Sequence, residues 1–233
     1  MMKTNKQTAI ILLSGGLDSV VSLAAVNNEI DIKLALTFDY GQKSIKKELD
    51  ASQKIAKYYG IKHRLIQLDW LKEITNTSLV SDLDIPTIDE AKLDNQEITQ
   101  KSMKNVWVPN RNGLFINIAA SFADSFDYDF IIIGANKEEA TTFSDNSERF
   151  IKDINEALKT STNNKTQVIA PLIELDKNEI VKKAIELKVP LQFINSCYNN
   201  TKKHCGKCES CNRLKRALKN AQLEKLITDL FEE

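Results

Sequence analysis

The sequence has no long hydrophobic run, no excess of charge of either sign and few cysteines. No apolar stretch approaches the about 18 residues of a membrane helix, and the run Ala9 to Leu13 is too short for a signal-peptide core. Lys plus Arg and Asp plus Glu both number 32, so the formal net charge is zero, which argues against a protein that coats nucleic acid. We therefore expect a cytoplasmic protein with neither membrane nor nucleic acid as a partner.

The chain is long enough for one sizeable domain. It has 233 residues, of which 42% are hydrophobic, so it can form a real core. It holds only four cysteines, and cysteines in a reducing compartment are typically metal ligands or reactive thiols rather than disulfides.

Short apolar runs alternate with helical patterns along the chain. Buried strands are predicted at 8–14, 32–38, 63–68 and 130–135. Helices are predicted at 18–28, 43–60, 113–126, 177–188 and from about 209 onward. The polar segment 69–110 is too long for an ordinary connection and is expected to be a functional loop or lid. The alternation predicts an α/β fold with a doubly wound, mostly parallel sheet.

The stretch Ser14-Gly15-Gly16-Leu17-Asp18-Ser19 joins the first predicted strand to the first predicted helix. Glycines let backbone N–H groups approach phosphate oxygens beyond the end of a strand, and the serines can add hydroxyl donors. Asp18 suits a helix cap or a ligand to the Mg²⁺ that accompanies nucleotides. Neither the Walker motif nor G-x-G-x-x-G occurs. The alternative is a tight Gly-Gly turn followed by a helix cap. We predict nucleotide binding by Leu13, Ser14, Gly15, Gly16, Leu17, Asp18, Ser19, Val20, Val21, Ser22 and Leu23.

All four cysteines lie near the end of the chain. Cys197, Cys205, Cys208 and Cys211 form the pattern C-x₇-C-x₂-C-x₂-C. Four thiolates complete a closed tetrahedral Zn²⁺ site, whereas an iron–sulfur cluster is the competing interpretation. His204 is a weaker ligand candidate and is expected to be a polar surface residue.

Together, the glycine loop and the cysteine cluster resemble those of the 7-cyano-7-deazaguanine synthases, a family of PP-loop ATP pyrophosphatases. The resemblance runs nearly the full length, and its further motifs are FDYGQ (38–42), VPNRN (108–112), Gly134 with NKEEATTFSDN, and APLIELDKNEI (170–180). It implies an adenine nucleotide alpha hydrolase-like PP-loop domain over 1–195. A C-terminal zinc-binding helical segment, 196–233, would pack on the same domain.

One segment departs from the family pattern. Glu139 stands where the family has aspartate, Asn146 stands where it has cysteine, and no Gly-Tyr-Pro is present, although Phe143 and Asp145 match. The departure bears on which base the protein accepts.

The resemblance implies an ATP-dependent carbon–nitrogen ligase for queuosine-type nucleoside biosynthesis. It would convert 7-carboxy-7-deazaguanine and ammonia to the nitrile through adenylate and amide intermediates, using ATP, Mg²⁺ and Zn²⁺ in a homodimer. The implied catalytic residues are Ser14, Asp18, Ser19 and Arg111, and the implied substrate contacts are Tyr40, Gln42, Arg111, Asn112, Glu139 and Asp145. Arg111 suits a charge clamp, and a surface salt bridge is its alternative. Plain loop packing is the alternative for Tyr40 and Gln42, and Trp107 is expected to be a packing aromatic.

Other functions remain as alternatives. One is a different adenylating enzyme of the same fold, which amidates a related deazaguanine or thiolates tRNA. Another is a zinc-ribbon nucleic-acid binder, because basic residues surround the cysteines: Lys202, Lys203, Lys207, Arg213, Lys215, Arg216 and Lys219. We expect these residues to form a solvated helix face or a surface that attracts an anionic substrate.

Overall fold

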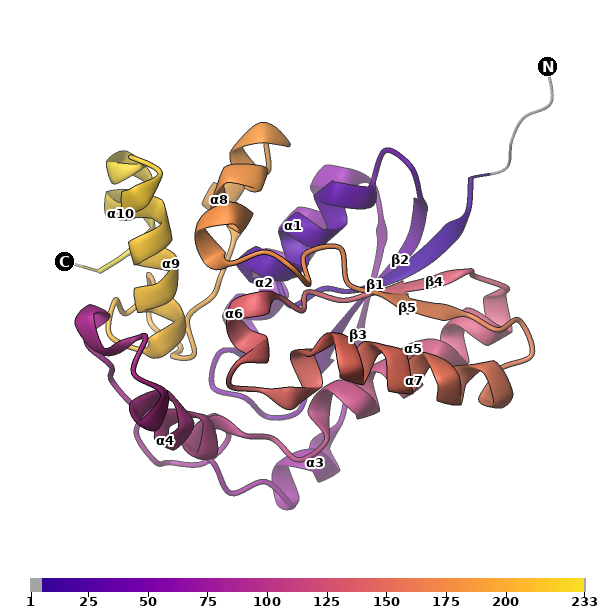
Figure 1. The fold of residues 1–233 in the computed structure, drawn as a ribbon, viewed down its shortest axis with the longest axis horizontal. Coiled ribbons are helices and arrows are strands. Elements are labelled where there is room, and N and C mark those ends of the chain that lie inside the picture. The colour runs from indigo at the N-terminus through magenta and orange to yellow at the C-terminus, as the bar shows by residue number, and fades with distance from the viewer. Residues whose placement is uncertain (1–5, 233) are drawn as a thin grey trace.

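The computed structural model describes residues 6–232 and contains a five-stranded sheet covered by helices on both faces (Figure 1). The strand order is β3-β2-β1-β4-β5, and every neighbouring pair is parallel. The strands are β1 (Thr8–Leu12), β2 (Asp31–Asp39), β3 (Lys62–Gln67), β4 (Phe130–Ile132) and β5 (Gln167–Ile169). This confirms the doubly wound α/β fold. The first five residues of the expected domain 1–195 lie outside the described residues.

The two helix layers follow from the strand order. Right-handed connections carry the chain outward from β1 to β3 with α1 (Leu17–Val26) and α2 (Ile45–Tyr59) on one face. The chain then returns to the other side of β1, so α5 (Arg111–Phe126) and α7 (Glu148–Ser161) cover the opposite face. The order reverses between β1 and β4, which is the point at which doubly wound sheets bind ligands.

The position of β1 in the hydrophobic core explains why its residues are almost all apolar. Ala9, Ile10 and Ile11 in β1 are fully buried because helices cover both sides of the sheet. The same hydrophobic cluster continues through α8 (Lys177–Glu186) to Cys211 and Leu214 in α9 (Glu209–Asn220). The last helix, α10 (Glu224–Leu230), follows α9 at the edge of the molecule (Figure 1).

The segment 69–110 is folded rather than an open loop. It contains α3 (Asp69–Glu73), η1 (Glu90–Lys92) and α4 (Gln96–Val106). The sequence pattern did not predict β5, α7, α6 (Lys137–Ala140) or the short helices η2 (Ser144–Asn146) and η3 (Leu191–Phe193). Strand β5 has only three residues, too few for an alternating pattern to emerge.

The predicted start of α8 is confirmed in detail. The Asp176 carboxylate accepts the Glu179 N–H at 2.9 Å, and the Glu179 carboxylate accepts the Asp176 N–H at 2.9 Å, which completes a capping box. Within residues 6–232, no helix combines the length and the apolar character that a membrane crossing requires.

Candidate active site

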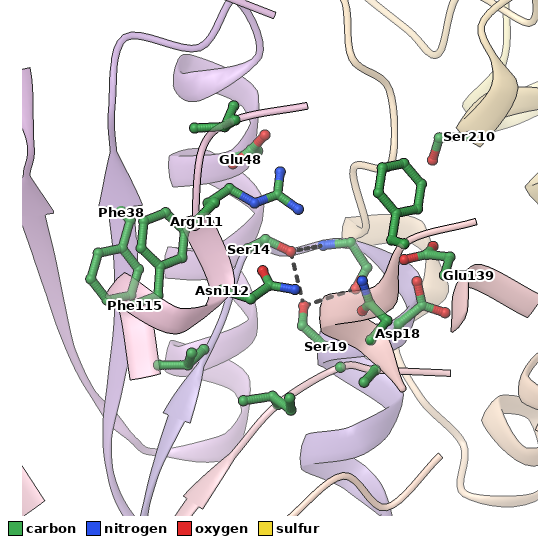
Figure 2. Close-up of a pocket in the computed structure, with 18 of the residues that line it drawn as sticks. Ser14, Asp18, Ser19, Phe38, Glu48, Arg111, Asn112, Phe115, Glu139 and Ser210 are labelled. Carbon is green, nitrogen blue, oxygen red and sulfur yellow. Dashed lines mark hydrogen bonds between the residues drawn. The ribbon is translucent and has the colours of Figure 1, made fainter. Parts of the chain in front are cut away.

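A cavity of about 250 Å³ lies at the switch point between β1 and β4. Its walls come from the glycine loop, the end of β4, the start of α5 and the cysteine segment, by which we mean residues 195–232. Figure 2 shows Arg111 and Asn112 pointing into the space beside Ser14 and Ser19, with Asp18 and Glu139 across from them. Residues far apart in the sequence therefore face one space.

The glycine loop is shaped by close packing. Gly15 has φ +79°, and a Cβ there would lie 2.6 Å from the Ala51 Cβ in α2. A Cβ on Gly134 would lie 2.8 Å from the Ser19 nitrogen. These glycines are needed where the loop meets α2 and where β4 meets the start of α1, which is a stricter requirement than access to phosphate alone.

The loop presents hydroxyl groups to the cavity. The Ser14 and Ser19 Oγ atoms lie 3.2 Å apart, and Ser19 Oγ donates to the Gly16 carbonyl at 3.0 Å. The Gly16 N–H donates to Ser14 Oγ at 3.3 Å. Within 13–23, the cavity-lining residues are Leu13, Ser14, Gly16, Asp18 and Ser19.

The remaining residues of the predicted nucleotide segment do not line the cavity. Val20, Val21, Ser22 and Leu23 are fully buried, because α1 runs from the loop into the interior. The side chain of Leu17 is also buried, and Gly15 backs onto α2. Side-chain contacts with a nucleotide in this cavity are therefore limited to the lining residues, and nucleotide binding by the whole of 13–23 stays a prediction.

Asp18 is not a helix cap. Gly16 is the N-cap residue of α1, and Asp18 lies in the first turn. Its Oδ2 lies 2.5 Å from Lys177 Nζ, and that ammonium lies 2.8 Å from Glu139 Oε1. The Oδ1 atom of Asp18 is buried and has no hydrogen-bond partner in the described chain. One lysine is thus shared by two carboxylates.

The shared lysine sets the charge state of this cluster. Burial raises the pKa of Asp18 to about 6, although Lys177 opposes the shift. Burial alone would lower the pKa of Lys177, but the carboxylates of Asp18 and Glu139 outweigh it and raise that pKa. Burial also opposes ionisation of Glu139, yet Lys177 holds its pKa below the ordinary value. At neutral pH the cluster therefore contains a charged lysine between two carboxylates.

Lys177 was not among the predicted site residues. It lies within the segment 170–180 that carried part of the family resemblance. No local pattern distinguishes it from the many other lysines, because its partners are 159 and 38 positions away in the sequence.

Arg111 has no direct ion pair among residues 6–232. Its Nη1 lies 3.5 Å from the Tyr40 hydroxyl, at the limit of a hydrogen bond. The guanidinium lines the cavity and points towards Ser14 (Figure 2). The surface salt bridge is therefore wrong for Arg111, and its charge remains available to an anion in the cavity.

The predicted substrate residues divide into two groups. Tyr40, Asn112, Glu139 and Asp145 line the cavity, whereas Gln42 does not. The Gln42 amide donates to the Phe38 carbonyl at 2.9 Å and to Glu48 at 3.0 Å, and its oxygen accepts the Tyr40 N–H at 3.0 Å. Gln42 therefore holds the turn after β2 from outside the cavity, which corrects the prediction that it contacts the substrate directly.

Aromatic side chains form two apolar walls that only the structure places. Phe38 and Phe115 are stacked with ring centroids 4.0 Å apart. Trp107 and Phe143 are nearly parallel at 6.3 Å, with an interplanar angle of 7°. All four line the cavity, so Trp107 packs against an aromatic partner and also faces the site.

The four cysteines come together beside this cavity. The sulfur atoms of Cys197, Cys205, Cys208 and Cys211 all lie within 4.8 Å of one another, and Cys205 and Cys211 are 3.8 Å apart. Tetrahedral zinc with Zn–S bonds of about 2.3 Å requires sulfur separations of about 3.8 Å. The four residues therefore fit a zinc ion, and no cysteine remains for a persulfide step.

His204 corrects the prediction of a surface residue. It is 3% exposed, and its Nε2 accepts the Ser196 N–H at 3.0 Å. Its Nδ1 lies 3.2 Å from the Leu230 carbonyl and donates there, so both ring nitrogens are occupied. His204 is not a member of the metal cluster.

Comparisons with known proteins identify the family of this site. The family model described as "Queuosine biosynthesis protein QueC" matches residues 8–222. The chain belongs to the QueC family. It is 50% identical over 217 residues to a 7-cyano-7-deazaguanine synthase of Methanosarcina barkeri, across 91% of this chain and 94% of the relative. It is 53% identical over 213 residues to the enzyme of the same name from Carboxydothermus hydrogenoformans, across 91% and 98%.

A solved structure supports the fold of this QueC-family chain. NMN synthetase from Francisella tularensis superposes with a TM-score of 0.50 at 14% identity, across 98% of this chain and 85% of that one. At this identity the likeness concerns the fold alone. Family membership makes the chain an ATP-using enzyme of queuosine biosynthesis, of the PP-loop ATP pyrophosphatase kind.

Three of the seven basic residues around the cysteines of this QueC-family chain form ion pairs with carboxylates. Arg213 is buried and pairs with Glu138 and with Glu209, the latter at 2.9 Å. Arg216 pairs with Glu138 at 3.0 Å and with Asp94 at 2.9 Å, and Lys219 Nζ lies 2.8 Å from Glu90. The expected solvated face is therefore wrong for Arg213, which is buried, whereas Lys219 is exposed. The three residues join α9 to α6 and to 90–94.

Proposed function

We propose that this chain converts 7-carboxy-7-deazaguanine and ammonia to 7-cyano-7-deazaguanine at the expense of ATP. The observation that carries the proposal is that the hydroxyl-lined loop and the unpaired guanidinium of Arg111 face one cavity. Such a cavity suits a reaction that joins a carboxylate to a phosphate chain.

The proposed chemistry proceeds through two activations. The substrate carboxylate attacks the α-phosphorus of ATP, and pyrophosphate leaves. Ammonia then displaces AMP to give the amide, and activation of the amide oxygen by a second ATP lets AMP leave as the nitrile forms. No covalent enzyme intermediate is required, so positioning and charge neutralisation supply the catalysis.

The residues of the loop are assigned to the phosphates. Ser14, Gly16 and Ser19 would hold the pyrophosphate end of ATP through hydroxyl and backbone donors. Arg111 would clamp the carboxylate or the α-phosphate, since its planar fork matches either anion. Together they would align the two reacting groups and neutralise the charge that develops between them.

Asp18 is the proposed Mg²⁺ ligand. Its buried Oδ1 has no protein partner along residues 6–232 and lies at the phosphate loop, which suits a hard cation. When bound there, Mg²⁺ would neutralise charge on the leaving pyrophosphate. Lys177 would hold the other Asp18 oxygen in place.

Polar groups in the cavity are assigned to the base. Glu139 gives one oxygen to Lys177, which leaves its second oxygen to accept from a ring N–H or exocyclic amine. Asp145 on η2 also lines the cavity, and the Asn112 amide donates to the Asp145 carbonyl at 3.2 Å. Tyr40, Asn112, Glu139 and Asp145 are the proposed substrate contacts, beside the walls that Trp107 and Phe143 form.

The remaining features concern the architecture and setting of the enzyme. We assign residues 1–195 to the PP-loop domain and 196–233 to a zinc-binding segment packed on the same domain. Cys197, Cys205, Cys208 and Cys211 would hold a structural zinc in four-fold coordination. We further propose a cytoplasmic homodimer that acts on small molecules without a nucleic-acid partner, because the thiolate cluster suits a reducing compartment and α9 carries neutralised arginines.

The deciding experiment is mass spectrometry of the products formed from ATP, Mg²⁺, ammonia and 7-carboxy-7-deazaguanine. We expect the nitrile, with two AMP and two pyrophosphate per product. ATP cleavage that occurs only with an unrelated acid would defeat the substrate assignment. Accumulation of the amide without nitrile would show that the enzyme carries out only the first activation and amidation.

A further inference from the structure

The C-terminal cysteine segment touches the phosphate loop directly. Ser196 Oγ accepts the Leu17 N–H at 3.2 Å, and the Asn195 N–H donates to the Gly15 carbonyl at 2.8 Å. Asn195 and Ser196 both line the cavity. Two consecutive residues of this segment therefore hold the backbone of the loop on either side of Gly16.

The hydroxyl proton of Ser196 has no acceptor within residues 6–232. The oxygen is occupied as an acceptor by Leu17, the first residue of α1, whose N–H has no partner inside the helix. A hydroxyl that accepts a hydrogen bond becomes a better donor to a second group. Because Ser196 lines the cavity beside Gly16, a phosphate oxygen at the loop is the group it can reach.

The backbone of Ser196 is held firmly from the other side. Its N–H donates to His204 Nε2 at 3.0 Å, and His204 is in turn fixed by the Leu230 carbonyl. The next residue, Cys197, belongs to the four-sulfur cluster. The side chain is therefore presented to the loop from a preorganised position rather than from a free loop.

We propose that Ser196 is a phosphate-binding residue that the cysteine segment supplies to the PP-loop site. It would add a hydroxyl donor beside Ser14 and Ser19, against the pyrophosphate end of ATP. The proposal rests on the placement of ATP given above. It gives the C-terminal segment a direct part in substrate binding as well as a structural one.

The test compares binding of ATP and AMP to the zinc-loaded protein by isothermal titration calorimetry. Ser196→Ala should raise the Kd for Mg-ATP about ten-fold or more, since hydrogen bonds to charged groups are strong, and should leave the Kd for AMP within about two-fold. Ser196→Thr keeps the hydroxyl and should restore most of the ATP affinity. Thr228→Val, which deletes an exposed hydroxyl on α10 of the same segment, should bind both nucleotides as the wild type does.

Two results would overturn the proposal. One is an unchanged ATP affinity in Ser196→Ala. The other is an equal loss for ATP and AMP, which would indicate a purely structural defect. The variants could instead bind ATP and AMP as expected while the wild-type protein forms no nitrile. That result would overturn the proposed reaction and leave the role of Ser196 standing.

Discussion

The ammonium group of Lys177, at the start of α8, lies 2.5 Å from the carboxylate of Asp18 in the first turn of α1. The lysine side chain is 7% exposed, and Glu139 lies on its other side at 2.8 Å. The contact joins the phosphate loop to the helix that follows β5, so one cation holds together two elements at the switch point.

Removal of this cation should destabilise the fold. Lys177→Met leaves the partly buried carboxylates of Asp18 and Glu139 without a counter-charge, and we expect the free energy of unfolding to fall by about 3 kcal/mol. Chemical denaturation at neutral pH measures the loss. Lys182→Met, which removes an exposed lysine from the same helix, should change it by less than about 0.5 kcal/mol.

The ion pair of Lys177 with Asp18 also predicts that a second substitution will restore part of the lost stability. Adding Asp18→Asn to Lys177→Met removes one of the two uncompensated carboxylates, so part of the lost stability should return while activity does not. A double variant no more stable than Lys177→Met would show that the pair does not interact energetically.

The phosphate loop should be essential for turnover. Asp18→Asn removes a carboxylate charge and Ser14→Ala removes a hydroxyl donor, and each should lower the rate of pyrophosphate release by about 100-fold. Circular dichroism should show an unchanged fold for Ser14→Ala, since Ser14 is exposed to the cavity. Near-normal release by both variants would contradict the assignment of this loop.

The cysteine cluster should bind about one zinc per chain. Since zinc binding contributes to folding, Cys208→Ser should lower the Tm by roughly 10 °C, equivalent to several kcal/mol in a chain of this length. Metal analysis and differential scanning calorimetry measure the two effects. Returning zinc to chelated wild-type protein should restore its Tm. Iron with a visible absorption band in anaerobically purified protein would identify a different metal centre.

Glu139 should affect binding of the deazaguanine base and not binding of the nucleotide. Glu139→Gln should raise the KM for 7-carboxy-7-deazaguanine about ten-fold, because an amide replaces a charged acceptor, with ATP affinity within about two-fold. Glu148→Gln, at an exposed position at the start of α7, is the matched control. Unchanged kinetics in Glu139→Gln would remove Glu139 from the substrate site.

His63 should make stability depend on pH below about 6.5. Burial lowers the pKa of His63 in the folded protein, where its Nε2 meets Thr37 and Ser52 at 2.8 and 3.2 Å. As the pH falls below 6.5, the unfolded chain takes up this proton first, so the stability that the neutral ring contributes is lost. Unfolding of wild type and His63→Gln from pH 7.5 to 5.5 should show the wild type losing more stability. Parallel profiles would contradict this.

Much of the fold and two parts of the site were predictable from the sequence. The apolar run of β1 reports burial on both faces of a parallel sheet. The loop from Ser14 to Ser19 and the cysteines from Cys205 to Cys211 carry their chemistry within a few consecutive residues. In each case the signal is local, because the spacing of neighbouring residues already fixes which groups meet.

What the tertiary structure decided is which distant residues complete the site. Lys177, Ser196 and His204 have no distinguishing pattern in the chain, because their roles come from partners brought close only when α8 and the cysteine segment pack against the loop. The same packing neutralises Arg213, and the turn after β2 directs Gln42 away from the cavity. Sequence periodicity determines which face of an element is buried, but contacts between elements depend on their relative placement, which no local spacing encodes.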